Sequence, residues 1–291
     1  MTDGEWYLPP TVRYTEWVTT HEYAHQYFQG LLASDEHRWP VLDEGFAEYA
    51  TGRAMEAWYG RGRELLDADG LRLDYWATEG GVAGFIDAPV AIASGVEAFP
   101  SYESYGHHVY RRAATMVHTA EAVASRHDVD RMLGEYARRA RFTHPTPDTL
   151  LAIAREVSPD LHGFLSRTLF APVDQEVSVD TMVVNARGAS SYDARVTLRV
   201  HGSAAWPRSI EWRLDDGRVV HDWWDGAATT VTRTLPRRPI SVSLDPPGRM
   251  SLEPYRLDDA RRLDLSASRP RSSLGGMLFD WASTLTAALG P

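Results

Sequence analysis

The 291-residue chain contains no cysteine, which excludes disulfide bonds and thiolate metal sites. Any transition metal would therefore be held by histidine and carboxylate side chains. No run of about 18 apolar residues occurs, so the sequence predicts no transmembrane helix. The opening residues, MTDGEWYLPP, lack the basic stretch and apolar stretch of a signal peptide. The compartment stays open, because cysteine-free proteins occur on either side of a membrane.

Positive charge is also scarce, since 30 Lys and Arg stand against 40 Asp and Glu, for a formal net charge of -10. No Lys/Arg-rich stripe could follow a phosphate backbone, so we expect no nucleic-acid partner. Aromatic residues are plentiful: 10 Trp and 13 Tyr provide apolar surface for a sizeable core. A chain of this length is longer than a single hydrophobic core usually holds, so we expect two domains, or three.

Helical periodicity dominates the chain up to Ala171. The first predicted helix runs from Tyr14 to Leu32, with Thr15 as a candidate N-cap, and the second from Asp43 to Tyr59, closed by Gly60. Further helices are predicted at His107–Ser125, Arg131–Arg139, Pro147–Val157 and Leu161–Leu169, after an irregular connection over Glu79–Pro100.

Period-two alternation replaces the helical pattern after Pro172. Strands are predicted at Glu176–Val184, Ala194–Val200, Ser209–Leu214, Thr229–Leu235 and Ile240–Leu244. The fold class is therefore α+β in separate domains: a mainly α-helical part (1–171) followed by a small antiparallel β-sandwich (172–262). Residues 263–291 are predicted to form a linker and a C-terminal amphipathic helix.

The segment HEYAH, which begins at His21, carries the strongest chemical signal. On a helix, positions i and i+4 share a face, so His21 and His25 can point at one metal ion. Glu22 lies between them, where its carboxylate can reach a metal-bound water and act as the catalytic base.

A third metal ligand must come from another segment. Glu44 follows His25 after eighteen intervening residues, at the start of the second predicted helix. Two antiparallel helices joined by such a loop can bring Glu44 over the two histidines. Two histidines and one glutamate leave an open position on a single Zn²⁺ ion, which is typical of a catalytic zinc site.

This pattern resembles the gluzincin zinc metallopeptidases of the aminopeptidase N family, whose HExxH motif is followed after eighteen residues by Glu in a WLNEGFA-like block. The matching positions of WPVLDEGFAEY are Trp39, Leu42, Glu44, Gly45, Phe46 and Ala47. Asp43 replaces the family's usual Asn. The resemblance implies a thermolysin-like, aminopeptidase-like zinc peptidase over about residues 14–170, which hydrolyses a peptide or protein substrate.

The family also has a tyrosine about sixty residues beyond the glutamate ligand, which stabilises the oxyanion of the tetrahedral intermediate. Its best match here is Tyr110, in Tyr-Arg-Arg-Ala, where Arg and Ala depart from the family's Lys and Gly. Four neighbouring side chains compete for this role: Tyr102, Tyr105, His107 and His108. Zinc-bound histidines usually donate their other N–H to a carboxylate, so Glu48 or Asp43 could orient His21.

Two family features have no counterpart in this sequence. The Gly-x-Met-Glu-Asn block, which holds the substrate's free amine, and the β lobe that precedes the zinc helix would both lie upstream of HExxH. The chain is then a fragment of a longer protein, has a misassigned start, or is a reduced relative. The alternative function is a non-catalytic zinc-containing binding module derived from a peptidase scaffold. The sequence leaves the oligomeric state and localisation open.

Overall fold

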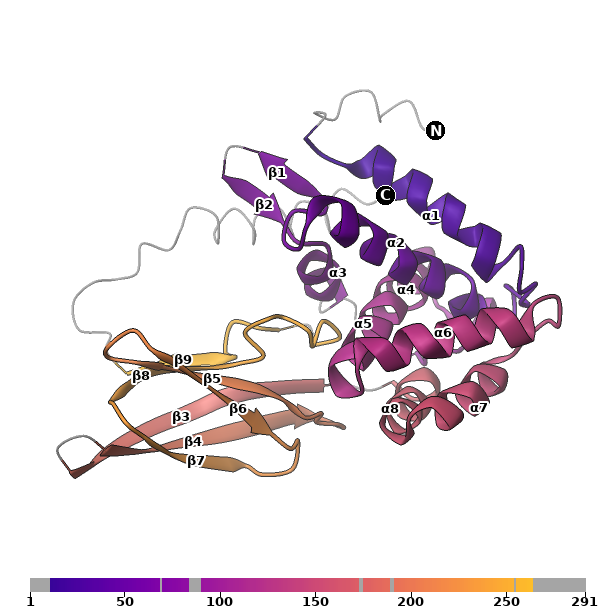
Figure 1. Ribbon diagram of the computed structural model, residues 1–291. Coiled ribbons are helices and arrows are strands. Elements are labelled where there is room, and N and C mark those ends of the chain that lie inside the picture. The colour runs from indigo at the N-terminus through magenta and orange to yellow at the C-terminus, as the bar shows by residue number, and fades with distance from the viewer. Residues whose placement is uncertain are drawn as a thin grey trace. The chain divides into compact units, whose positions relative to one another are not determined.

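The computed structural model describes residues 11–68, 70–83, 90–172, 175–188, 191–253 and 255–263 (Figure 1). The chain divides into two compact units, Met1–Pro172 and Val173–Pro291. The first unit is mainly helical, and the second consists of antiparallel sheets. In the part of the chain described here, no helix is both long and apolar enough to cross a membrane.

Eight α-helices and a small hairpin make up the described part of the first unit. The α-helices are α1 (Tyr14–Phe28), α2 (Glu44–Tyr59), α3 (Tyr75–Ala83), α4 (Tyr102–Tyr105), α5 (Ala113–Val123), α6 (Arg126–Ala140), α7 (Pro147–Val157) and α8 (Pro159–Phe170). Two 3-10 turns, η2 (Pro40–Leu42) and η3 (Val96–Ala98), a π-helical segment, η4 (Gly106–Arg112), and the strands β1 (Leu66–Ala68) and β2 (Leu71–Leu73) connect them.

The first two helices pack along each other, and Phe28 of α1 stacks on Phe46 of α2 with ring centroids 5.7 Å apart. The prediction of Thr15 as N-cap is wrong, because α1 already begins at Tyr14. The helix also ends before the predicted Leu32, since the chain turns away after Phe28. In contrast, α2 ends at Tyr59 as predicted, because Gly60 adopts a φ of 83°.

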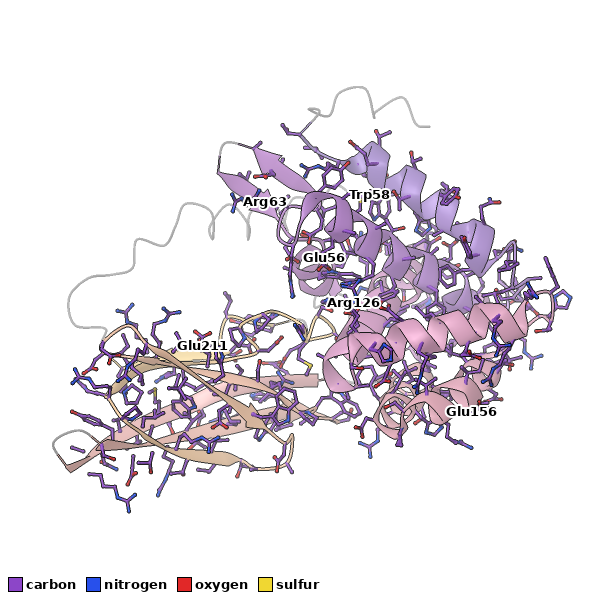
Figure 2. All side chains as sticks on the ribbon, viewed as in Figure 1. Glu56, Trp58, Arg63, Arg126, Glu156 and Glu211 are labelled. Atoms are coloured by element: carbon purple, nitrogen blue, oxygen red, sulfur yellow. The ribbon has the colours of Figure 1, made fainter. Side chains whose placement is uncertain are left out.

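The hairpin and α3 were not predicted. Helix α3 extends to Ala83, so the first residues of the predicted irregular connection from Glu79 to Pro100 are helical instead. Polar contacts attach it to α2: the indole N–H of Trp76 donates at 3.3 Å to Glu56, which is labelled in Figure 2. Both aromatic residues at the start of α3, Tyr75 and Trp76, are fully buried, so tertiary packing fixes this helix.

The helix predicted from His107 to Ser125 is made up of two segments, and a short helix that was not predicted precedes them. Helix α4 leads into the π-helical segment η4, which continues as α5 and ends at Val123. Ser125 instead caps the next helix, accepting a hydrogen bond from the Asp128 N–H at 3.0 Å, so α6 begins five residues before the predicted Arg131. Helix α7 has the predicted bounds, and α8 extends the predicted one at both ends.

The second unit contains two antiparallel sheets. One has the strand order β3-β4-β7 and the other the order β6-β5-β8-β9. The strands are β3 (Gln175–Gly188), β4 (Ser191–Gly202), β5 (Arg208–Leu214), β6 (Val219–Trp224), β7 (Thr230–Leu235), β8 (Pro239–Leu244) and β9 (Ala260–Arg262). Strands β6 and β9 were not predicted, and β3 and β4 are longer than their predicted counterparts.

Both sheets contribute to a single hydrophobic core, in which Trp212 and Trp224 are the largest side chains. Burial alternates along β5, as expected for a strand with one face toward a core. An ion pair between Arg208 and Glu253 is fully buried beside this core. The predicted C-terminal helix lies outside the described residues.

Candidate metal centre

The two histidines of the HEYAH segment lie one turn apart on α1, with their side chains on the same face. Their Nε2 atoms are 3.1 Å apart, and the rings meet edge to face with centroids at 4.7 Å. His21 is buried and His25 is half-buried. Helical spacing therefore brings two imidazole nitrogens to one point.

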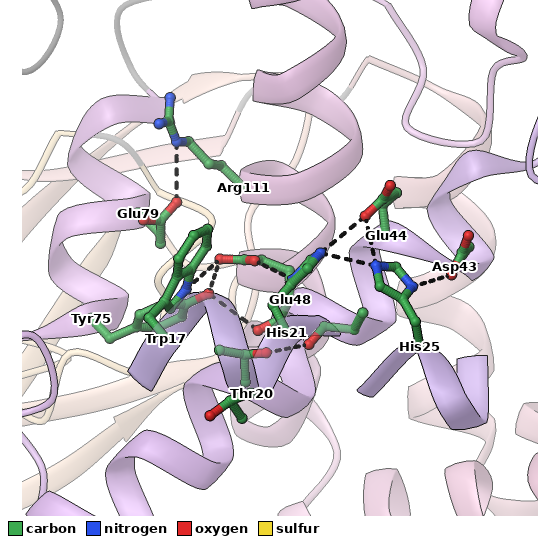
Figure 3. A network of polar contacts seen from close by, with 12 residues as sticks. Trp17, Thr20, His21, His25, Asp43, Glu44, Glu48, Tyr75, Glu79 and Arg111 are labelled. Carbon is green, nitrogen blue, oxygen red and sulfur yellow. Dashed lines mark hydrogen bonds and ion pairs between the residues drawn. The ribbon is translucent and has the colours of Figure 1, made fainter. Parts of the chain in front are cut away.

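Glu44 completes this cluster from the first turn of α2 (Figure 3). Its Oε2 atom lies 3.1 Å from Nε2 of His21 and 3.2 Å from Nε2 of His25. The eighteen-residue connection predicted from the sequence thus returns the chain to the two histidines. Among the described residues, only His21, His25 and Glu44 form a cluster of three or more side chains able to share a metal ion.

The separation of these three atoms fits a tetrahedral ion. Ligand bonds of about 2.0–2.1 Å at tetrahedral angles separate donor atoms by about 3.3 Å. The observed separations of 3.1, 3.1 and 3.2 Å form a nearly equilateral triangle of that size. Two nitrogens and one carboxylate oxygen are also a ligand set that zinc commonly takes, so the residues fit the predicted ion.

Each histidine has a carboxylate next to its second ring nitrogen, Nδ1. Nδ1 of His21 lies 2.9 Å from Oε2 of Glu48, and Nδ1 of His25 lies 2.6 Å from Oδ1 of Asp43. The sequence made both acids candidates to orient His21; the structure assigns Glu48 to that ring and Asp43 to the other. Both acids are buried. Each carboxylate favours the tautomer of its histidine that carries the proton on Nδ1.

The electrostatics of the cluster favour positive charge between the rings. Burial lowers the pKa of His21, but Glu44 and Glu48 outweigh it and raise the value to about 9. Hydrogen bonds to Asp43 and Glu44 raise the pKa of His25 to about 10. Burial opposes ionisation of Glu44, yet its bonds with His21, His25 and Tyr110 lower its pKa to about 2. A bound cation would balance the negative charge of these carboxylates, as the protons on the two histidines do.

Glu22, the predicted base, is exposed on α1 next to His21. Within the described ranges it forms no hydrogen bond or ion pair that would hold its carboxylate elsewhere. Its side chain is accordingly accessible to water.

Tyr110 is the predicted oxyanion donor that the structure brings to the cluster. Its ring stacks on His21 with centroids 5.7 Å apart, and its hydroxyl is hydrogen-bonded to Glu44. Burial and this contact raise the pKa of the Tyr110 hydroxyl, which stays a proton donor. The residue lies in η4, and wide π turns of this kind are frequent at functional sites.

A glycine allows this approach of η4 to α2. A Cβ atom on Gly45 would lie 2.5 Å from Cβ of Ala113 and 2.9 Å from the backbone oxygen of Val109. Only a residue without a side chain fits at this distance. Gly45 therefore lets the first turn of α2, with Glu44, lie against the segment that carries Tyr110.

The four other candidates for the oxyanion donor have different surroundings from Tyr110. The Tyr105 ring packs on Tyr110 at 6.0 Å, and Tyr102 is 73% exposed. His107 and His108 are buried, and Nδ1 of His108 lies 2.8 Å from the backbone oxygen of Ser104. Of these five side chains, Tyr110 is the one that bonds to Glu44.

Sequence reasoning missed two residues of this region, Trp17 and Tyr75, which both bond to Glu48. Trp17 precedes His21 by one helical turn, and that spacing was a usable signal. For Tyr75 the sequence offered none, because α3 itself was not predicted.

No protein-family model matches the chain, and no curated protein matches it. Among solved structures, the chain is similar to the crystal structure of Legionella pneumophila aminopeptidase A in complex with aspartic acid, with 14% sequence identity and a TM-score of 0.49. The match covers 78% of this chain and 25% of that chain, so it spans about a quarter of the length of the Legionella protein. Similarity at this level does not identify a shared function.

Proposed function

We propose that this protein is a zinc-dependent metallopeptidase that hydrolyses peptide bonds, with an aminopeptidase-like thermolysin-type helical part and a β-sandwich behind it in sequence. The observation that supports it most is the triangle formed by His21, His25 and Glu44, with sides of 3.1 to 3.2 Å. Structural zinc sites usually have four protein ligands, whereas catalytic ones have three and an open position.

His21, His25 and Glu44 would hold one Zn²⁺ ion, and Glu48 and Asp43 would fix the two imidazole rings. When bound, zinc supplies Lewis acidity, which lowers the pKa of water and polarises a carbonyl group. Glu22 is positioned one residue after His21 to accept a proton from the attacking water on its carboxylate. It then transfers that proton to the leaving amine of the peptide or protein substrate.

Tyr110 supports the developing negative charge on the scissile carbonyl oxygen. Its hydroxyl remains protonated, because burial raises its pKa, and it lies beside Glu44. The hydroxyl can stabilise the oxyanion once it exchanges its bond with Glu44 for one with the carbonyl oxygen. Glu22 is exposed, so a substrate can reach its carboxylate.

The test is metal content followed by peptide hydrolysis. Wild type should contain about one zinc per chain, and His21→Ala and Glu44→Ala should contain little. His127→Ala is the matched control, since His127 is exposed on α6 and distant in sequence from the cluster. Full zinc occupancy in Glu44→Ala would exclude Glu44 as a ligand. A zinc-loaded wild type that cleaves no peptide in a broad library would favour the non-catalytic zinc module.

A further inference from the structure

Glu48 is a buried carboxylate at the centre of a polar network behind the metal ligands (Figure 3). Only 1% of the residue is exposed. One oxygen faces Nδ1 of His21 at 2.9 Å, and the other accepts hydrogen bonds from the indole N–H of Trp17 at 3.2 Å and the hydroxyl of Tyr75. A carboxyl group buried in this way needs polar partners for its oxygens.

The tyrosine in this network is held from several sides. Tyr75 is fully buried at the start of α3, and its backbone N–H donates to Glu64 at 3.3 Å. Its ring lies against Gly52 of α2, where a Cβ atom would come within 2.4 Å of Cε1 of Tyr75. Gly52 follows Glu48 by one helical turn. The absence of a side chain there lets the Tyr75 hydroxyl reach the carboxylate.

A second acid of this region, Glu79, has a positively charged partner. Glu79, one turn after Tyr75 on α3, is ion-paired with Arg111 at 3.2 Å. Burial raises the pKa of Glu79 to about 7 against the lowering effect of Arg111, and the charge of Glu48 adds to the rise. Arg111 therefore compensates Glu79, which leaves Glu48 to the two donors Trp17 and Tyr75 and to its ion pair with His21. The Tyr75 hydroxyl is one of only two donors on the oxygen that faces away from His21, in the part of the chain that the structure describes.

We propose that Tyr75 is a positioning residue for the metal ligand His21, and that it acts through Glu48 together with Trp17. Tyr75 and Trp17 fix the oxygen of Glu48 that points away from the centre, which aims the other oxygen at Nδ1 of His21. The N–H of His21 then stays on Nδ1, and Nε2 presents its lone pair toward the ion. This inference rests on the proposed metal site, since it assigns a residue that tunes that site.

The alternative is that Tyr75 only fills space beneath α2. The two roles separate in Tyr75→Phe, which keeps the ring and removes the hydroxyl. Tyr136→Phe is the matched control, because Tyr136 is also fully buried and its hydroxyl has no hydrogen-bond partner among the described residues. Both variants lose one buried hydroxyl, and only the first loses a bond to Glu48.

The experiment titrates metal-free full-length protein with Zn²⁺ in competition with a chelating indicator, and with Co²⁺ followed by visible absorption. Loss of a residue that orients a metal ligand typically weakens metal binding 10- to 100-fold, and Tyr75 acts one contact further away, so we expect about tenfold weaker binding in Tyr75→Phe. The Co²⁺ absorption bands should also shift. Tyr136→Phe should bind like wild type, within about twofold.

A double-mutant cycle identifies the path of the effect. If Tyr75 acts through Glu48, then adding Tyr75→Phe to Glu48→Gln should weaken metal binding much less than it does in the wild-type background. Additive effects would overturn the proposed path, and wild-type affinity and spectrum in Tyr75→Phe would overturn the inference alone. A wild type that binds neither ion would overturn the metal site itself. Should Tyr75→Phe fail to fold, Trp17→Phe removes the other donor and is judged by the same outcomes.

Discussion

The ring of Tyr110 stacks on the ring of His21, with centroids 5.7 Å apart and planes inclined by 19°. The same tyrosine bonds through its hydroxyl to Glu44, so it contacts two of the three converging side chains. Its ring packs against a predicted metal ligand while its proton donor lies at the edge of the cluster. A substitution can therefore remove the hydroxyl while the ring keeps most of its packing.

Tyr110→Phe should therefore lower kcat by about 10²- to 10³-fold, the usual cost of removing one donor to a developing oxyanion. Zinc content should stay near that of wild type, since the stacked ring remains. Steady-state kinetics on a cleaved peptide and elemental analysis of the same preparation check both parts. Tyr105→Phe serves as control and should retain most activity; a larger loss there than in Tyr110→Phe would reassign the donor to Tyr105.

Glu22→Gln should retain zinc and lose turnover. Loss of a general base typically costs about 10²- to 10⁴-fold, because the amide cannot accept the proton of the attacking water. The measurement is kcat at matched metal occupancy. Glu16→Gln changes another exposed glutamate of α1 and should leave the rate unchanged. A near-normal rate in Glu22→Gln would exclude this residue as the base.

Gly45→Ala should destabilise the first unit and disturb the metal centre together. The new methyl group would meet Cβ of Ala113 at 2.5 Å, and overpacking of this kind costs about 1–3 kcal/mol. Relief requires α2 to move away from η4, which would displace Glu44 and weaken zinc binding. Chemical unfolding and zinc titration measure the two effects.

Gly134→Ala is the control for that substitution. Gly134 lies on α6 with open space around its Cα, so alanine there should be neutral or stabilise the helix by up to about 1 kcal/mol. If Gly45→Ala behaved in the same way, the close approach between α2 and η4 would not constrain position 45.

The second unit should lose stability as pH rises, because of Asp259. Burial and the nearby charge of Glu253 raise the pKa of this carboxyl to about 8, against the lowering effect of Arg256. The folded state then holds a proton that the unfolded chain, with a pKa near 3.8, has released. The resulting stabilisation is complete below about pH 4 and is lost progressively up to about pH 8, by as much as about 1.4 kcal/mol per pH unit.

Asp259→Asn removes this titration and should flatten the pH dependence between about pH 5 and pH 8. Hydrogen exchange on peptides from β5 and β8, corrected for the intrinsic rate at each pH, reports the opening of this unit separately from the other. Equal slopes in the variant and wild type would show that Asp259 is not protonated in the folded chain.

Much of the candidate site could be predicted because its geometry is local. The spacing of His21 and His25 fixes their shared face, and Glu44 stands at a helix start, where an acid is favoured. The roles of these residues remain predictions. Glu48 and Asp43 were foreseeable as partners of the histidines, but which acid serves which ring depends on how α2 is rotated against α1, and no sequence pattern encodes that rotation.

The elements that escaped prediction depend on contacts distant in sequence. Helix α3 has weak helical amphipathicity and is held by the burial of Tyr75 and Trp76 beneath α2. The π-helical segment η4 has the composition of an ordinary helix, so its wider turn could not be read from the residues. Strand β6 was missed because its residues do not alternate in hydrophobicity although its burial does: Val219 and Trp223 are exposed, whereas Asp222 is half-buried.

The π-helical segment makes the number of residues before Tyr110 as important as their identity. An α turn bonds each N–H to the carbonyl four residues earlier and a π turn to the carbonyl five residues earlier, so η4 takes up about one residue more than a regular helix. Deleting one residue within Gly106–Arg112 should therefore restore a regular helix that keeps the two flanking helices nearly in phase but removes the wide turn that carries Tyr110. The place of the Tyr110 ring against His21 thus depends on the length of this segment, which substitution scans leave unchanged.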